Sequence, residues 1–168
     1  VHPSDMCVAL AALDATVLVE GPKGKREIKF TDFHRLPGNT PEKDNILGEK
    51  EMITYVEIPD NKFNKNIHYL KVRDRSSYAF ALVSVAVALD IQNNTIKDVK
   101  LAMGGVSHKP WRLTEAEEFL KGKAVSETIF KQAAALAMHG ARAYGENNFK
   151  LTLGPNAIIE ALTIAASK

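Results

Sequence analysis

The stretch that decides the fold is residues 69–89, which read YLKVRDRSSYAFALVSVAVAL. Three cations, Lys71, Arg73 and Arg75, alternate along it and lead into a long apolar run that begins at Ala79. Because alternate side chains of an extended chain lie on one face, this pattern predicts a positive edge leading onto a buried strand. A solvated start of a strand, with no role in binding, would explain the same cations.

The segments on either side of this stretch predict a mixture of strands and helices. Ser4 or Asp5, just before the apolar run that starts at Met6, is typical of a helix N-cap. Thr114 with Glu117 three residues later has the pattern of a capping box. Strands are expected at 16–20, 27–30, 52–58, 67–72, 79–91 and 96–103, and helices at 6–13, 114–120, 126–141 and 155–166. The alanines of 79–91 leave a helix possible there. Strands followed by a run of helices favour an α+β fold, with a boundary near residue 60.

Length and composition narrow the class of protein. The 168 residues are 45% hydrophobic and 25% charged, as in ordinary globular domains. A net charge of +2, with the cations scattered, argues against nucleic acid or an anionic membrane surface as a partner. The most apolar run, 79–89, is too short to span a bilayer. Because the sequence starts without an initiating Met, we expect a piece of a longer polypeptide.

Side chains that commonly carry catalysis or bind metals are dispersed along the chain. The histidines at 2, 34, 68, 108 and 139 lack the one-turn spacing of a zinc helix, and a single Cys7 excludes both an intrachain disulfide and a cluster of cysteine ligands. No nucleophile elbow, phosphate loop or dinucleotide loop is present. We therefore expect surface histidines, no catalytic residue and no metal site, with any reactive group supplied by a cofactor.

Seven segments, taken together and in order, resemble one protein family. They are HPSDM at 2–6, DFH at 32–34, LPG at 36–38, KVRDRSSYAFALVSV at 71–85, GGV at 104–106, KPWR at 109–112 and ENNFK at 146–150. The chain resembles the C-terminal half of the FAD-binding subunit of the molybdenum hydroxylases, which include xanthine dehydrogenase, carbon monoxide dehydrogenase and aldehyde oxidoreductase. The resemblance is greatest to the flavoprotein subunit of the bacterial aldehyde oxidoreductases that have three separate subunits.

This resemblance implies a division of the chain into two parts. Residues 1–60 would form the tail of the second α/β subdomain of the FAD-binding module. Residues 61–168 would form the C-terminal domain found in the CO dehydrogenase flavoprotein, with an antiparallel three-stranded sheet and helices on one face. The α+β fold expected from the strand and helix pattern agrees with that division.

The resemblance also implies three cofactor-binding residues. Asp5 matches an aspartate that contacts the flavin, and Ile53 matches an aliphatic residue at the isoalloxazine. Lys71 matches a lysine near the flavin ring, where a cation would stabilise the anionic reduced flavin. Without a flavin, Asp5 could be a helix cap and Ile53 part of a strand core. Tyr78 could stack on the ring or simply pack, and both alternatives stay open.

The function implied by the resemblance is electron transfer in an oxidoreductase. The subunit would pass electrons from iron–sulfur centres through FAD to an external acceptor, with an iron–sulfur subunit and a molybdenum-cofactor subunit as partners. The family's glycine-rich phosphate loop and its cysteine-rich insert precede this region, so we expect the chain alone to hold FAD weakly. The alternative is a non-catalytic docking domain, in which Trp111 and Arg112 form an exposed anchor for partner subunits.

Overall fold

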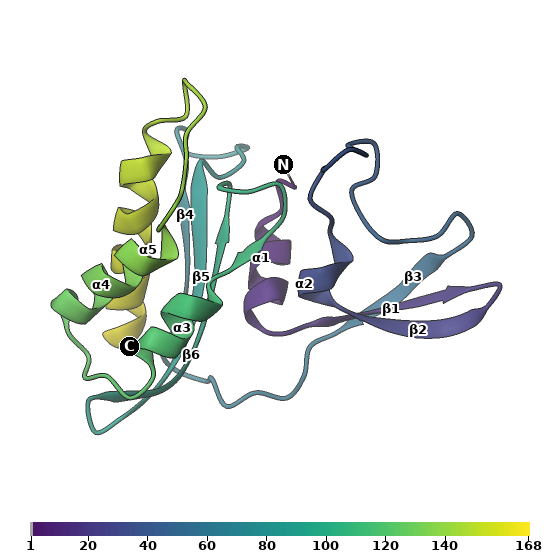
Figure 1. Cartoon of the computed structure of the whole chain (residues 1–168). Helices are drawn as coiled ribbons and strands as arrows, with labels where there is room; N and C mark the ends of the chain where they lie inside the picture. The colour runs from purple at the N-terminus through teal and green to yellow at the C-terminus, as the bar shows by residue number, and fades with distance from the viewer. Residues whose placement is uncertain (1) are drawn as a thin grey trace.

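The computed structural model describes residues 2–168 and contains two antiparallel sheets with helix α1 (Asp5–Ala12) between them (Figure 1). The smaller sheet has the order β2-β1-β3, from β1 (Thr16–Gly21), β2 (Gly24–Lys29) and β3 (Met52–Glu57). The larger sheet has the order β4-β5-β6-β7, from β4 (Ile67–Val72), β5 (Val83–Gln92), β6 (Thr95–Gly104) and β7 (Trp111–Arg112). The other helices are α2 (Phe30–Phe33), α3 (Thr114–Leu120), α4 (Glu127–Ala137) and α5 (Lys150–Ala166).

The larger sheet is covered on both faces because its strands alternate large and small side chains. Val83, Val85 and Val87 of β5 are buried in the core shared with α3, α4 and α5. On the opposite face, Ala86 and Ala102 belong to a second core, together with residues of α1 and the smaller sheet. The predicted α+β fold is confirmed. The structure adds the short strand β7 and shows that α1 covers part of the second face.

Helix α1 begins as the sequence predicts. The Ser4 hydroxyl accepts a hydrogen bond from the backbone N–H of Cys7 at 3.3 Å, so Ser4 is the N-cap. Asp5 is the first residue of the helix, and its carboxylate is therefore free to contact another element. Within residues 2–168, no helix combines the length and the apolar character needed to cross a bilayer.

The predicted positive edge is wrong beyond Lys71. Strand β4 ends at Val72, and β5 begins at Val83 instead of Ala79, which leaves residues 73–82 as a loop. Arg73 and Arg75 lie in this loop and are exposed. Tyr78 has a φ of 52°, which an extended strand cannot accommodate, so the strand period does not continue through the loop.

Two helix boundaries also differ from the prediction. Helix α4 ends at Ala137 instead of Ala141, and α5 begins at Lys150 instead of Pro155, although Gly154 was expected to separate the helix from the preceding residues. A Cβ atom at Gly154 would lie 2.9 Å from Cε of Met138, so the glycine permits close packing of α5 against Met138. The glycine is therefore explained by packing within a helix, and it does not mark a helix end.

Candidate functional site

The structure brings Asp5 and Lys71 into direct contact. Nζ of Lys71 lies 2.8 Å from Oδ2 of Asp5, and the hydroxyl of Tyr69 donates to Oδ1 of Asp5 at 3.1 Å. The side chain of Lys71 is 26% exposed and that of Asp5 is 44% exposed. The cluster is thus open enough for a ligand to reach it and buried enough to have a fixed geometry.

The strand register explains why these residues meet. Lys71 pairs with Ser84 and Tyr69 pairs with Ala86, so both side chains lie on the sheet face that carries small residues. Helix α1 packs against this face, and its first residue, Asp5, meets both side chains there.

Gly104, at the end of β6, makes this approach of α1 possible. A Cβ atom at this position would lie 2.5 Å from Oγ of Ser84 and 2.6 Å from Cγ2 of Val8. Neither contact can be tolerated unless Ser84 and Val8 move. The glycine therefore sets the distance between the helix that carries Asp5 and the sheet that carries Lys71.

Electrostatics favour a stable cluster with spare donor capacity. Burial raises the pKa of Tyr69, so its hydroxyl keeps its proton and donates to Asp5. An ammonium group has three N–H donors, and in the part of the chain that the structure describes Lys71 uses one of them, on Asp5. The remaining N–H groups can donate to an acceptor on a ligand.

Ile53 lies in the other sheet, on β3. It is 41% exposed and pairs with Val19, whose side chain is buried in the core that includes α1. Because directly paired residues of antiparallel strands share a face, Ile53 points to the side of the sheet on which α1 packs. All six residues of β3 are exposed, so its sequence alternation does not correspond to a buried strand in this chain.

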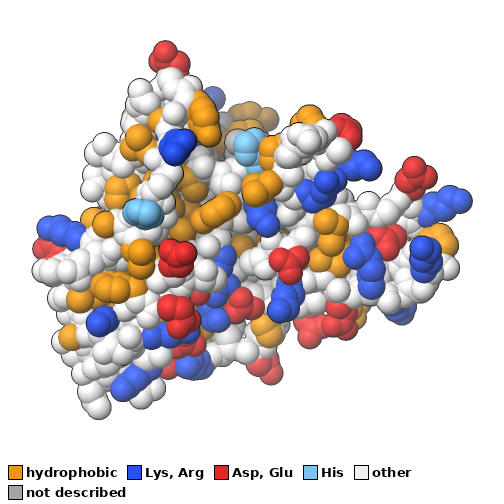
Figure 2. Space-filling view, viewed as in Figure 1, with side chains coloured by type: hydrophobic (Ala, Val, Ile, Leu, Met, Phe, Trp, Pro, Cys, Tyr) orange, Lys and Arg blue, Asp and Glu red, His pale blue; other side chains and the backbone are white. Residues whose placement is uncertain are grey.

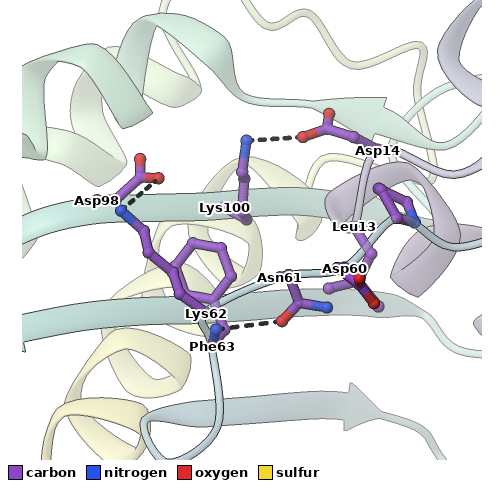
Figure 3. Close-up of a pocket in the computed structure, with 9 residues that line it drawn as sticks. Leu13, Asp14, Asp60, Asn61, Lys62, Phe63, Asp98 and Lys100 are labelled. Atoms are coloured by element: carbon purple, nitrogen blue, oxygen red, sulfur yellow. Dashed lines mark hydrogen bonds and ion pairs between the residues drawn. The ribbon is translucent and has the colours of Figure 1, made fainter.

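A surface hollow lies where the segment after β3 crosses the larger sheet (Figure 3). Its cations are paired: Nζ of Lys100 lies 2.6 Å from Asp14, and Nζ of Lys62 lies 3.3 Å from Asp90 and 3.4 Å from Asp98. Its lysines therefore offer little free charge to an anionic ligand. Figure 2 likewise shows acidic and basic side chains interspersed over the face in view, without an extended field of one sign.

The expectation of surface histidines is wrong for His34. This residue is 7% exposed, and its ring lies 4.2 Å, between centroids, from the ring of His2. Nε2 of His2 lies 3.1 Å from Sγ of Cys7. The spacing of His2, Cys7 and His34 along the sequence matches no metal-binding motif. Sequence reasoning missed the cluster because the packing of α2 against α1 creates it.

Arg112 and Glu117 also have buried side chains. This contradicts the predicted exposed anchor at Arg112 and the predicted capping box between Thr114 and Glu117. The Arg112 side chain is 9% exposed and donates to Glu117, Asp14 and the carbonyl oxygen of Ala11. Glu117 accepts from the backbone N–H of Leu101 at 2.6 Å, so it does not form a capping box with Thr114. Arg112 is therefore a structural link and is not part of an exposed anchor.

Comparison with known proteins identifies the family. Residues 68–163, more than half of the chain, match the family described as CO dehydrogenase flavoprotein C-terminal domain. Residues 1–61 match the family described as FAD binding domain in molybdopterin dehydrogenase. The chain belongs to the FAD-binding subunits of the molybdenum hydroxylase family. The resemblance stated from the sequence is thereby confirmed.

Individual relatives agree with this assignment. The aldehyde oxidoreductase FAD-binding subunit PaoB of Escherichia coli K12 is 41% identical over 99% of this chain and 49% of its own length. The glyceraldehyde dehydrogenase medium chain of Sulfolobus acidocaldarius is 36% identical over 79% of this chain and 44% of its own length. The chain thus spans about half the length of these relatives.

A solved structure has the same fold. Quinoline 2-oxidoreductase from Pseudomonas putida 86 superposes with a TM-score of 0.84 at 25% identity, over 98% of this chain and 56% of that one. The described residues fit part of what FAD requires. Lys71 retains N–H donors suited to the polar edge of a flavin ring, whereas the described segments contain no glycine-rich phosphate loop.

Proposed function

We propose that this chain forms one wall of the flavin cleft in an electron-transfer subunit of a molybdenum-dependent aldehyde or xanthine-type oxidoreductase. The observation that carries the proposal is the half-open contact between Lys71 and Asp5, two of the residues that the family resemblance assigns to the flavin. FAD, when bound, would accept electrons from iron–sulfur centres and pass them to an external acceptor.

Lys71, Asp5 and Ile53 would each have a separate task in that cleft. Lys71 donates from a spare N–H group and adds positive charge at the polar edge of the ring. Asp5 orients the ammonium group and offsets part of its charge. Ile53 supplies exposed aliphatic surface for the ring face. None of the three performs acid–base chemistry on the substrate.

We further propose the division of the chain at residue 60, with 1–60 belonging to the FAD-binding module and 61–168 to the C-terminal domain. The two family matches, 1–61 and 68–163, support it. Iron–sulfur clusters and the molybdenum cofactor would reside in partner subunits or in other segments of the subunit. An iron–sulfur subunit and a molybdenum-cofactor subunit are the partners that this function requires.

The full-length subunit tests the proposal through its flavin content. Lys71→Ala should lower the flavin bound per subunit, or its affinity, because a donor and a charge are removed from the cleft. Lys97→Ala is the matched control, since Lys97 is an exposed strand lysine on β6. Flavin absorbance of the purified proteins is the measurement. Equal flavin content, affinity and redox potential in all three proteins would overturn the role of Lys71.

The second candidate function is subunit docking without a role in shaping the flavin site. The observation that favours it is Trp111, which is 42% exposed on the edge strand β7. Trp111→Ala should then impair assembly with the partner subunits, as measured by co-purification. Docking becomes the main role if that variant fails to assemble while Lys71→Ala leaves flavin content and potential unchanged.

A further inference from the structure

We propose that His2, Cys7 and His34 form a binding site for one transition-metal ion of the class represented by Zn²⁺. One nitrogen from each histidine and Sγ of Cys7 all lie within 4.8 Å of one another. Imidazole nitrogen and thiolate sulfur are the ligands that Zn²⁺ prefers in proteins. The site goes beyond the flavin role and does not depend on it.

The spacing of the ligand atoms is close to that of a tetrahedral site. With Zn–N bonds of about 2.0–2.1 Å and Zn–S bonds of about 2.3 Å, ligand atoms lie about 3.3–3.6 Å apart. Nε2 of His2 is already 3.1 Å from Sγ of Cys7. The His34 nitrogen lies within 4.8 Å of both atoms, so ion binding would draw it closer, and a fourth position would remain for water or another donor.

His34 has an unmet bonding need at this position. It is 7% exposed, and within residues 2–168 its Nδ1 atom is buried without a hydrogen-bond partner. Buried polar atoms are normally satisfied, so an unpaired ring nitrogen on a residue of this cluster requires an explanation.

The backbone around the site holds all three ligands in place. The N–H of His2 donates to the carbonyl oxygen of His108 at 2.9 Å. Cys7 is fixed in the first turn of α1 by the Ser4 cap. His34 directly follows α2 as its C-cap, and the centroids of the Phe30 and Phe33 rings lie 5.3 and 5.1 Å from that of its own ring. Such supported side chains pay little entropy when they bind an ion.

Charge acts on the site in both directions. Lys109, which donates to the carbonyl oxygen of Thr31 at 2.8 Å, opposes a cation, and Asp44 favours one. Binding would deprotonate Cys7, so that an S–H bond breaks, a sulfur–metal bond forms and the proton goes to solvent. The negative charge of the bound thiolate would then lie in the first turn of α1, where the helix dipole favours anions.

Zn²⁺ titration of the full-length subunit against a chromophoric chelator tests the site. Cys7→Ala and His34→Leu should each weaken one Zn²⁺ site by more than about 100-fold, which exceeds the effect of losing a supporting residue. His139→Leu is the control, because His139 is exposed, follows α4 and is not part of the cluster. Lys71→Ala should leave Zn²⁺ binding unchanged, so failure of the metal site and failure of the flavin role are distinguishable.

Two measurements keep the proposal testable if a variant misfolds. In the unmutated subunit, Zn²⁺ should slow alkylation of Cys7, followed by mass spectrometry of the peptide that contains it. Co²⁺ should give a thiolate-to-cobalt charge-transfer band that Cys7→Ala abolishes. Unchanged alkylation of Cys7 in the presence of Zn²⁺, or equal Zn²⁺ affinity in Cys7→Ala, would overturn the proposal.

Discussion

The guanidinium of Arg112 and the carboxylate of Glu117 form a buried pair, with Nη2 of Arg112 at 3.1 Å from Oε2 of Glu117 and Nε against Oε1. Oε1 of Glu117 also accepts from the backbone N–H of Leu101 at 2.6 Å. The pair thus joins β7, α3 and β6. Through Asp14 and the carbonyl oxygen of Ala11, Arg112 extends the link to the end of α1.

Removal of Glu117 should destabilise the protein strongly. Glu117→Ala leaves the Arg112 charge with less compensation and the Leu101 N–H unpaired, which should cost about 3–5 kcal/mol. Asp14→Asn is the comparison, since the Asp14 side chain is half-exposed and the exchange should cost no more than about 1 kcal/mol. Asn also tolerates the positive φ at this position. Urea unfolding measures the loss in the free energy of unfolding for both variants. Equal losses would contradict the structural role of the buried Arg112–Glu117 pair.

Gly104→Ala should disturb the placement of Asp5 against Lys71. The new methyl group would clash with Ser84 and Val8, and overpacking of this kind costs about 1–3 kcal/mol. Gly48→Ala is the control, because a methyl group there meets only the flexible Glu51 side chain, at 3.4 Å or more. Thermal unfolding should separate the two variants. A neutral Gly104→Ala would show that α1 is not held at a fixed distance from the sheet.

The stability of the metal-free protein should fall as the pH drops from about 6.5 to about 4. Burial lowers the pKa of His34 to about 4, whereas an unfolded histidine titrates near 6.5, so acid protonates the unfolded chain first. The contribution of His34 is therefore complete above pH 6.5 and is lost by pH 4, with a loss of about 3 kcal/mol.

His34→Leu should remove this part of the pH dependence. Urea unfolding with a chelator present compares the variant with the unmutated protein across the range, and data well above pH 6.5 report the packing change alone. An unchanged slope between pH 6.5 and pH 4 in the variant would show that another group is responsible.

The larger sheet could be predicted from the sequence because its two faces impose a strict alternation. Val83, Val85 and Val87 alternate with small residues along β5, and such alternation is typical of a strand. The pattern failed in the loop 73–82, where the positive φ of Tyr78 is incompatible with an extended strand. No local rule assigns that angle to a tyrosine.

The candidate site was less predictable because its contacts are long-range. Lys71 and Asp5 meet across 66 residues, and the family resemblance, not the residue pattern, singled them out. The His2, Cys7 and His34 cluster has no spacing signal, since it depends on how α2 packs against α1. Glu117 satisfied a local capping rule but found a stronger partner in the Arg112 cation.

The midpoint potential of FAD in the full-length subunit tests the central claim most directly. Lys71→Met should lower the potential by about 30 mV or more, equivalent to about 1.4 kcal/mol for two electrons, because a cation that favours the reduced ring is lost. Asp5→Asn should raise it, since the carboxylate no longer offsets the Lys71 charge. Opposite shifts in these two variants, with Lys97→Ala unchanged, are the result we predict. Potentials that stay equal in all of them would contradict the account.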